Sequence, residues 1–207
     1  GTDTGVGKTL VSCALLHGFA ARGKRVAGFK PVAAGCDDDD HNEDAKRLRV
    51  ASSVQAAYGQ INPYCFPHAI APHLAARHAG ARIEFSRILA SYHELAGQAE
   101  EVIVEGVGGF CVPLNEKQDS TDLVRELDLP VILVVGMRLG CLNHALLTQR
   151  AIAGCQLEFA AWVANVQNPD MPALQENIEA LRERLPAPLL GVIPYQQQQD
   201  ARAAAAY

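Results

Sequence analysis

Short apolar runs alternate along the chain with segments whose apolar residues recur at helical spacing. The apolar runs predict strands at Val26 to Phe29, Glu101 to Val104, Pro130 to Val135, a run ending in Trp162 to Asn165, and Leu189 to Ile193. Helical spacing predicts helices at about Lys8 to Arg22, Ala45 to Ala51, Phe85 to Gly97, Ser120 to Leu127, Asn143 to Ala153 and Ala173 to Leu185. Strands that alternate with helices predict a three-layer α/β/α fold around a mostly parallel sheet.

The remaining segments predict loops and a tail. Ile61 to His73 is punctuated by prolines and carries aromatic residues, so we expect a loop that forms a wall of a substrate site. Cys36 to Asp44 is acidic and predicts a solvated, mobile loop. The low-complexity runs Gln196 to Gln199 and Ala203 to Ala206 predict a frayed tail.

Length and composition agree with the predicted fold and argue against some classes of partner. With 207 residues, 49% of them hydrophobic, the chain can bury one good core, so we expect a single domain over residues 1–207. The net charge is −5 and the basic residues are scattered, which argues against a nucleic-acid groove or an anionic membrane surface. No apolar run approaches the roughly 20 residues of a membrane span.

The cysteines and histidines predict neither disulfides nor a metal site. Six cysteines are dispersed without any Cys-x-x-Cys pair, which is typical of reduced thiols in a cytoplasmic protein. His68, His73 and His78 recur at intervals of five, a spacing that does not bring three imidazoles onto one helical face.

The first candidate for chemistry is a phosphate-binding loop of the P-loop NTPase type, Gly1 to Thr9. Gly5 and Gly7 allow backbone N–H groups to converge on phosphate oxygens, and the following helix adds its positive end. In such a loop Lys8 contacts the β- and γ-phosphates, and the Thr9 hydroxyl coordinates Mg²⁺. Five residues rather than four separate the first glycine from Gly-Lys-Thr, so this is a stretched variant. A glycine-rich turn that only caps a helix is the alternative. Such a loop ordinarily follows a buried strand, so we expect one before Gly1.

Charged side chains at strand ends are the second candidate. Lys30 follows the strand at Val26 to Phe29, and Glu105 follows the strand at Glu101 to Val104. The carboxyl ends of parallel strands face the ligand crevice, so Lys30 can meet phosphate and Glu105 can lie near Mg²⁺. An ordinary surface lysine and a carboxylate that caps the next turn are the alternatives. Asp44 stands at a helix entry, where it can cap the helix or ligate Mg²⁺.

Several separated stretches together resemble the dethiobiotin synthetase family. They are Thr2 to Thr9, Phe29-Lys30-Pro31-Val32, Asn62-Pro63-Tyr64, Val104 to Gly109, Leu139 to His144 and Val163-Ala164-Asn165, in this order over nearly the whole chain. The resemblance implies an ATP- and Mg²⁺-dependent cyclo-ligase of biotin synthesis. The implied substrates are 7,8-diaminopelargonic acid and CO₂ or bicarbonate, and the implied assembly is a homodimer with the substrate site at the subunit interface.

The resemblance also implies roles for individual residues. Lys30 and Lys8 are the implied catalytic residues, and Thr9, Asp44 and Glu105 the implied Mg²⁺ ligands. Nucleotide contacts are implied for Gly5, Val6, Gly7, Lys8, Thr9, Leu10, Asp44, Glu105, Gly106, Val107, Gly108, Asn165, Val166, Ile193, Pro194 and Tyr195. Substrate contacts are implied for Ala34, Gly140, Cys141, Leu142 and Asn143, with the turn from Gly140 contributed by the neighbouring subunit.

The chain departs from this family at two positions. Ala34 stands where many relatives carry serine, so a hydroxyl contact to substrate is absent or replaced by backbone. Gly5 stands where some relatives have glutamate, so no side chain acts there.

Two related classes of protein remain as alternatives. Dimeric switch ATPases of the partitioning and septum-placement type use an extra lysine near the start of the loop, where this chain has Asp3. Glutamine-dependent amidases of the cobalamin pathway need a separate glutaminase domain, for which 207 residues leave no room. A plain scaffold role does not explain why the loop, Lys30 and Glu105 all fall at strand carboxyl ends.

Overall fold

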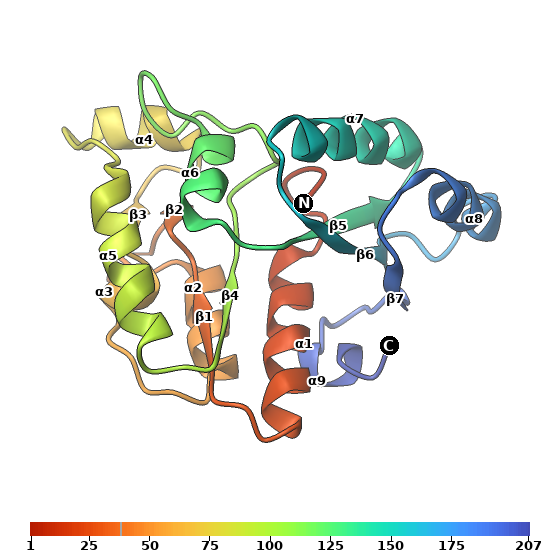
Figure 1. The fold of residues 1–207 in the computed structure, drawn as a ribbon, viewed down its shortest axis with the longest axis horizontal. Helices are drawn as coiled ribbons and strands as arrows, with labels where there is room; N and C mark the ends of the chain where they lie inside the picture. The colour runs from red at the N-terminus through yellow and green to blue at the C-terminus, as the bar shows by residue number, and fades with distance from the viewer. Residues whose placement is uncertain (38) are drawn as a thin grey trace.

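The computed structural model describes residues 1–37 and 39–207, in which helices alternate with parallel strands (Figure 1). In chain order the elements are α1 (Lys8–Ala21), β1 (Val26–Phe29), β2 (Val32–Ala34), α2 (Glu43–Ala51), α3 (Tyr58–Ile61), β3 (Tyr64–Phe66), α4 (Pro72–His78), α5 (Phe85–Ala96), β4 (Glu101–Val104), α6 (Ser120–Leu127), β5 (Val131–Met137), α7 (Cys141–Gly154), β6 (Phe159–Val166), α8 (Leu174–Arg184), β7 (Leu189–Ile193) and α9 (Ala201–Ala204). The predicted α/β class with parallel strands is confirmed.

Both faces of the sheet β5-β6-β7 are covered. Successive side chains of a strand point to opposite faces. Leu133 and Val135 of β5 belong to the apolar cluster that includes α7 and α8, whereas Val134 belongs to the cluster that includes α1 and α9. The order helix, sheet, helix follows from this alternation, because an apolar strand can be buried on both sides only if helices cover both.

The other strands pair separately. β1 pairs with β4 in parallel, with Phe29 opposite Val104, and β2 pairs with β3. A largely apolar cavity of about 480 Å³ lies between β4 and β5, and α1 and α6 also line it. The backbone N–H of Thr2 donates to the Val134 carbonyl at 3.0 Å, so the chain enters beside β5.

The predicted loop at Ile61 to His73 is partly wrong, because it contains β3 and the start of α4. Pro31 follows β1, and the chain then leaves that ladder and pairs β2 with β3 about 30 residues later. Three-residue strands are too short to show an alternation of apolar and polar residues, so no pattern in the sequence predicts them.

The cysteine prediction is wrong for one pair. β2 and β3 bring Cys36 and Cys65 within 6.2 Å between Cα atoms, and the structure joins them as a disulfide. The other cysteines, Cys13, Cys111, Cys141 and Cys155, are unpaired among the described residues. The spacing of 29 residues between the paired cysteines carries no signal, because their contact depends on a strand pairing that the sequence does not reveal.

The predicted frayed tail and the predicted acidic loop have different outcomes. The tail is not frayed over residues 201–204, because the Asp200 carboxylate accepts the Arg202 and Ala203 N–H groups and caps α9, whose Ala204 is buried. Figure 1 shows α9 beside α1. The acidic loop prediction includes Asp38, which lies outside the described residues, so that part of the prediction is not addressed.

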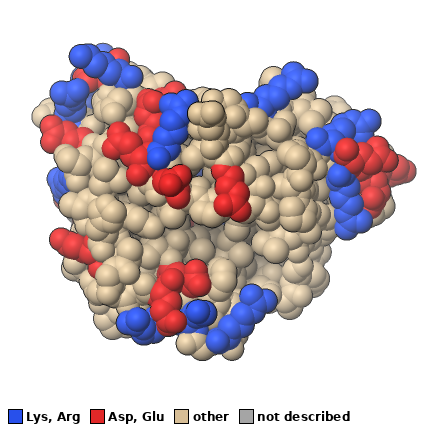
Figure 2. All heavy atoms as spheres, viewed as in Figure 1, with Lys and Arg blue, Asp and Glu red and all other residues tan. Residues whose placement is uncertain are grey.

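The surface carries mixed charge. On the face that Figure 2 shows, acidic and basic side chains are intermixed, and no broad area of that face is basic. Among the helices in the part of the chain that the structure describes, none combines the length and apolar character needed to cross a membrane.

Candidate active site

The glycine-rich loop takes a conformation that requires glycine. Gly5 has φ 74° and Gly7 has φ 93°, in the left-handed region that side chains disfavour. A Cβ at Gly7 would lie 2.1 Å from Nδ2 of Asn165, so the space is closed as well. That amide donates to the Val6 carbonyl at 2.9 Å and ties the loop to the end of β6. Asn165 therefore fixes the position of the loop, and α1 starts directly after the loop at Lys8.

Lys8 connects this loop to a second glycine-rich segment. Its Nζ donates to the Asp3 carbonyl and to the Gly108 carbonyl, both at 2.7 Å, and so links the loop to the glycine-rich turn that follows β4. Burial lowers the pKa of Lys8, and the positive charge of Lys30 lowers it further. Two carbonyls are modest partners for a half-buried ammonium, so an anion that entered here would gain a strong electrostatic partner.

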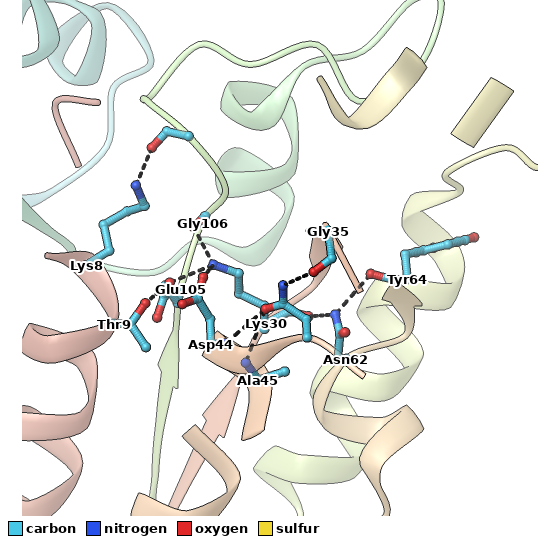
Figure 3. Close-up of polar contacts among 12 residues, drawn as sticks. Lys8, Thr9, Lys30, Gly35, Asp44, Ala45, Asn62, Tyr64, Glu105 and Gly106 are labelled. Carbon is cyan, nitrogen blue, oxygen red and sulfur yellow. Dashed lines mark hydrogen bonds and ion pairs between the residues drawn. The ribbon is translucent and has the colours of Figure 1, made fainter. Parts of the chain in front are cut away.

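Lys30 lies between two carboxylates (Figure 3). Phe29 is opposite Val104 in the parallel ladder, so the next residues, Lys30 and Glu105, leave the two strands side by side. The Lys30 Nζ is 2.6 Å from Oε1 of Glu105 and 3.0 Å from Oδ2 of Asp44. The side chains of Lys30 and Glu105 are buried, at 3% and 2% exposed, whereas that of Asp44 is 42% exposed.

The protonation states of this group follow from its partners. Burial by itself would lower the pKa of Lys30, but the Glu105 and Asp44 carboxylates outweigh burial and raise it above its usual value. Burial opposes ionisation of Asp44, but Lys30 outweighs this effect and lowers the pKa of Asp44. At neutral pH the cluster therefore holds a charged Lys30 ammonium beside the ionised Asp44 carboxylate.

The oxygen atoms of the cluster fit a hard divalent cation such as Mg²⁺. The Thr9 hydroxyl donates to Oε1 of Glu105 at 3.0 Å, while Oε2 of Glu105 is buried and has no hydrogen-bond partner among the described residues. Such an unpaired buried oxygen is costly, and a cation would satisfy it. Residues 1–37 and 39–207 contain no cluster of three or more His, Cys, Asp or Glu that could hold a metal alone. Thr9, Asp44 and Glu105 would therefore supply only part of a ligand set, which Mg²⁺ would complete with phosphate and water oxygens.

These groups share one cavity of about 700 Å³. It brings together the predicted site residues Gly5, Gly7, Lys8, Thr9, Leu10, Lys30, Ala34, Asp44, Glu105, Val107 and Gly108. Four further wall residues, Ala69 to Pro72, come from the segment that the sequence indicated as a substrate wall. Sequence reasoning missed Asn42, Arg47 and Gln199, which also line the cavity; Gln199 lay in the run interpreted as a tail.

Comparison with known proteins identifies the family. A sequence family described as an AAA domain matches residues 1–203. The chain is 54% identical over 202 residues to the ATP-dependent dethiobiotin synthetase BioD of Nitrosospira multiformis, covering 98% of this chain and 89% of the relative. It is 54% identical over 198 residues to the protein of the same name from Aromatoleum aromaticum, with 94% and 88% covered. The chain belongs to the ATP-dependent dethiobiotin synthetase family. It is accordingly an enzyme of the ATP-dependent ligase class.

Several predicted nucleotide contacts of this dethiobiotin synthetase family member lie outside the cavity wall. The side chains of Val6, Asn165, Val166 and Ile193 are buried, and Asn165 uses its amide on the loop rather than on open space. Pro194 and Tyr195 are exposed beyond the end of β7. Contact with the base of a nucleotide at these positions would therefore depend on backbone groups and on the exposed Pro194 and Tyr195. Such contact remains a prediction.

The predicted substrate turn is also separate from the cavity. Gly140, with φ 91°, precedes α7, whose first residue Cys141 is buried and whose Asn143 is exposed. Within the described ranges, the cavity wall does not include residues 140–143. Leu139 is 98% exposed directly beside this turn, and Leu147 on α7 is 54% exposed.

Proposed function

We propose that this protein makes dethiobiotin from 7,8-diaminopelargonic acid, CO₂ and ATP. The observation that carries the proposal is the buried Lys30 ammonium, held between Glu105 and Asp44 beside a phosphate-binding loop in a member of this family. An ammonium that a divalent cation frees from its two carboxylates would compensate the charge of a transferring phosphoryl group, and such compensation is the main demand of phosphoryl transfer.

The proposed chemistry has three steps. One amine of the substrate attacks CO₂ and loses a proton, which gives a carbamate. A carbamate oxygen then attacks the γ-phosphorus of ATP, and ADP leaves, which gives a carbamic-phosphoric anhydride. Finally the second amine attacks the carbonyl carbon and loses a proton, and phosphate leaves as the cyclic urea closes. The last step is intramolecular, so orientation of the two amines supplies much of its rate.

The residues of the cavity divide this work by position. Lys8 and Lys30 both line the cavity and would neutralise the nucleotide phosphates and the carbamate. Lys30 keeps its proton through neutral pH because two carboxylates hold it, so it acts as a fixed positive charge rather than as a base. Thr9, Asp44 and Glu105 would hold Mg²⁺, which when bound neutralises phosphate charge. Ala34 presents only backbone polar groups to the substrate.

The second part of the proposal is a homodimer. The exposed Leu139 and Leu147 flank the N-terminus of α7, and the Gly140 to Asn143 turn offers backbone N–H groups of the kind that bind a carboxylate. An apolar patch beside an anion site fits the carboxylate end of the substrate's carbon chain. In the proposed dimer, the turn of one subunit would bind this end of a substrate that lies in the cavity of the partner subunit. Light scattering measures the mass of the parent and of Leu139→Lys in solution. We expect the parent to have the mass of two chains, and the mass of a single chain for both proteins would overturn the dimer.

We also propose a cytoplasmic location. The four unpaired cysteines support it, while the Cys36–Cys65 disulfide is the observation that stands against it. Mass spectrometry of alkylated protein from fresh cell extract decides between a reduced and an oxidised pair in the cell.

The activity is tested with MgATP, bicarbonate and 7,8-diaminopelargonic acid. We expect ADP release that depends on the diamine, and a product one carbonyl heavier and two hydrogens lighter than the diamine. The matched control replaces the diamine with 7-aminononanoic acid, which offers one amine and cannot close a ring. ATP hydrolysis that ignores the diamine would refute the proposal and support a switch ATPase.

A further inference from the structure

The backbone of Lys30 is clamped by residues that the proposed mechanism does not use. Its N–H donates to the Ile61 carbonyl at 2.8 Å, and its carbonyl accepts from Nδ2 of Asn62 at 2.7 Å. Asn62 is 3% exposed and also donates to the Tyr64 carbonyl at 3.0 Å. Pro31 interrupts the ladder after Lys30, so these bonds replace the strand pairing that would otherwise fix it.

The Tyr58 hydroxyl connects this clamp to the other side of the site. It donates to Oδ1 of Asn62 at 3.1 Å and accepts from the backbone N–H of Asn42 at 2.7 Å. Asn42 is buried and caps α2, because its Oδ1 accepts from the backbone N–H of Asp44 at 3.0 Å. Its Nδ2 donates to the Gly35 carbonyl at 3.1 Å and anchors the end of β2.

The bonds form a closed ring through the candidate active site. The ring runs from the Lys30 carbonyl through Asn62, Tyr58 and Asn42 to the first turn of α2, where Asp44 returns to the Lys30 ammonium at 3.0 Å. Figure 3 shows the Asn62 and Asp44 sides of this ring around Lys30. The two halves come from different elements, α3 with its following residue and the entry to α2, and a single phenolic hydroxyl joins them.

We propose that Tyr58 is a positioning residue that sets the separation of Lys30 and Asp44. The inference rests on the proposed function, because it assigns the ring to the phosphate and cation site of that reaction. Asp44 needs such support, since its side chain is 42% exposed and its place in the first turn of α2 directs it at Lys30. Burial raises the pKa of Tyr58, so the hydroxyl keeps its proton and remains a donor throughout the neutral range.

Tyr58→Phe tests the ring because it removes one oxygen and keeps the aromatic ring. The Tyr58 ring packs on His41 with centroids 3.9 Å apart, a contact that phenylalanine retains. The matched control is Tyr92→Phe, since Tyr92 also packs on an aromatic ring, that of Phe29 at 6.1 Å. We expect Tyr58→Phe to lower kcat about tenfold, which is about 1.4 kcal/mol, and to raise the Mg²⁺ concentration for half-maximal rate several-fold. Tyr92→Phe should change neither.

A second readout does not depend on turnover. Calorimetry measures ADP affinity with and without Mg²⁺ for the parent and both variants. We expect Tyr58→Phe to lose about tenfold in affinity when Mg²⁺ is present and almost nothing when it is absent, because the loop itself is unchanged. A loss that is equal with and without Mg²⁺, or equal in both variants, would overturn the assignment and indicate general loosening.

The outcomes separate this inference from the proposed function. If the parent shows no diamine-dependent ADP release, the proposed function fails, while the calorimetry still reports whether Tyr58 controls the cation site. If the parent is active and Tyr58→Phe matches it in kcat and in Mg²⁺ dependence, the positioning role is wrong and the proposed function stands. Thermal unfolding confirms that each variant is folded. If Tyr58→Phe does not fold, Asn42→Ala takes its place, because alanine removes the Oδ1 that accepts from the Asp44 N–H and so opens the ring at the entry to α2. An unchanged Mg²⁺ dependence in that variant refutes the ring.

Discussion

Replacement of Lys30 by methionine should cost both stability and activity. Methionine fills much of the same volume but leaves the Glu105 carboxylate, 2% exposed, without its partner at 2.6 Å. Breaking a buried pair from one side costs about 3 to 5 kcal/mol. Asp44 is half exposed and regains water, so we expect the low end, about 3 kcal/mol, which lowers Tm by about 6 to 12 °C in a chain of this size.

The difference in stability between the parent and Lys30→Met should depend on pH in a definite direction. The raised pKa of Lys30 means that its contribution to stability is fully present below the unfolded value, about 10.4, and is lost as the pH rises through the folded value. The lowered pKa of Asp44 means that its contribution is present above about 3.9 and is lost as the pH falls through the folded value. The difference in stability between parent and Lys30→Met should therefore be greatest near pH 7 and shrink in acid.

The assay is urea unfolding at pH 4, 5, 6 and 7.5, with kcat measured at pH 7.5. We expect kcat of Lys30→Met to fall by about 10²- to 10³-fold, since a preorganised positive charge is lost from the phosphoryl-transfer site. Lys24→Met is the matched control, because Lys24 pairs with Glu100 at the surface, where an ion pair adds little. Equal stability of Lys30→Met and the parent at pH 7.5 would refute the argument from the buried charge, and a near-normal kcat would remove Lys30 from the mechanism.

Three further predictions follow from single contacts. Glu105→Gln should raise the Mg²⁺ requirement of the reaction, because it removes the unpaired buried carboxylate oxygen; an unchanged Mg²⁺ titration counts against a metal role. Gly7→Ala should abolish nucleotide binding in calorimetry, because φ is 93° and the new Cβ meets Asn165 at 2.1 Å; retained binding would show that the loop adapts. Cys36→Ser should lower the free energy of unfolding in oxidising buffer by about 3.6 kcal/mol, from the loop of roughly 30 residues that the disulfide to Cys65 closes, and leave it unchanged in dithiothreitol. The same loss in both buffers would mean that the bond does not form.

The regular elements were largely predictable because their patterns are local. Val26 to Phe29, Ser120 to Leu127 and Leu189 to Ile193 were predicted with the bounds that the structure has. Helix α2 begins at Glu43, two residues before its predicted start, because Asn42 rather than Asp44 caps it. An asparagine before two acidic residues is itself an N-cap signal, so the sequence contained this boundary.

The pairing of distant elements was not predictable from the sequence. The short strands β2 and β3, the Cys36–Cys65 disulfide and the docking of α9 on α1 all depend on contacts between segments far apart in the chain. Lys30 and Glu105 were each predicted as strand-end residues, but their contact required knowing that β1 and β4 are neighbours and that Phe29 is opposite Val104. Asn62 belonged to a recognised motif, yet nothing in the sequence pointed to its bond with the Lys30 carbonyl.

The charge balance of the site explains why the nucleotide and the cation should depend on each other. Lys8 and Lys30 bring two positive charges to the cavity, and Asp44 and Glu105 bring two negative charges within reach of Lys30. Arg47 also lines the cavity, but its charge is paired with Glu43 at 3.1 Å. The cluster is therefore close to neutral and offers little net attraction to the highly charged triphosphate. A divalent cation held by the two carboxylates would free Lys30 from them and turn the cavity positive, so that phosphate could replace the carboxylates as the partner of Lys30. On this reasoning the buried carboxylates keep the lysine charged and in place before the nucleotide arrives, and Mg²⁺ decides when that charge becomes available to the phosphates.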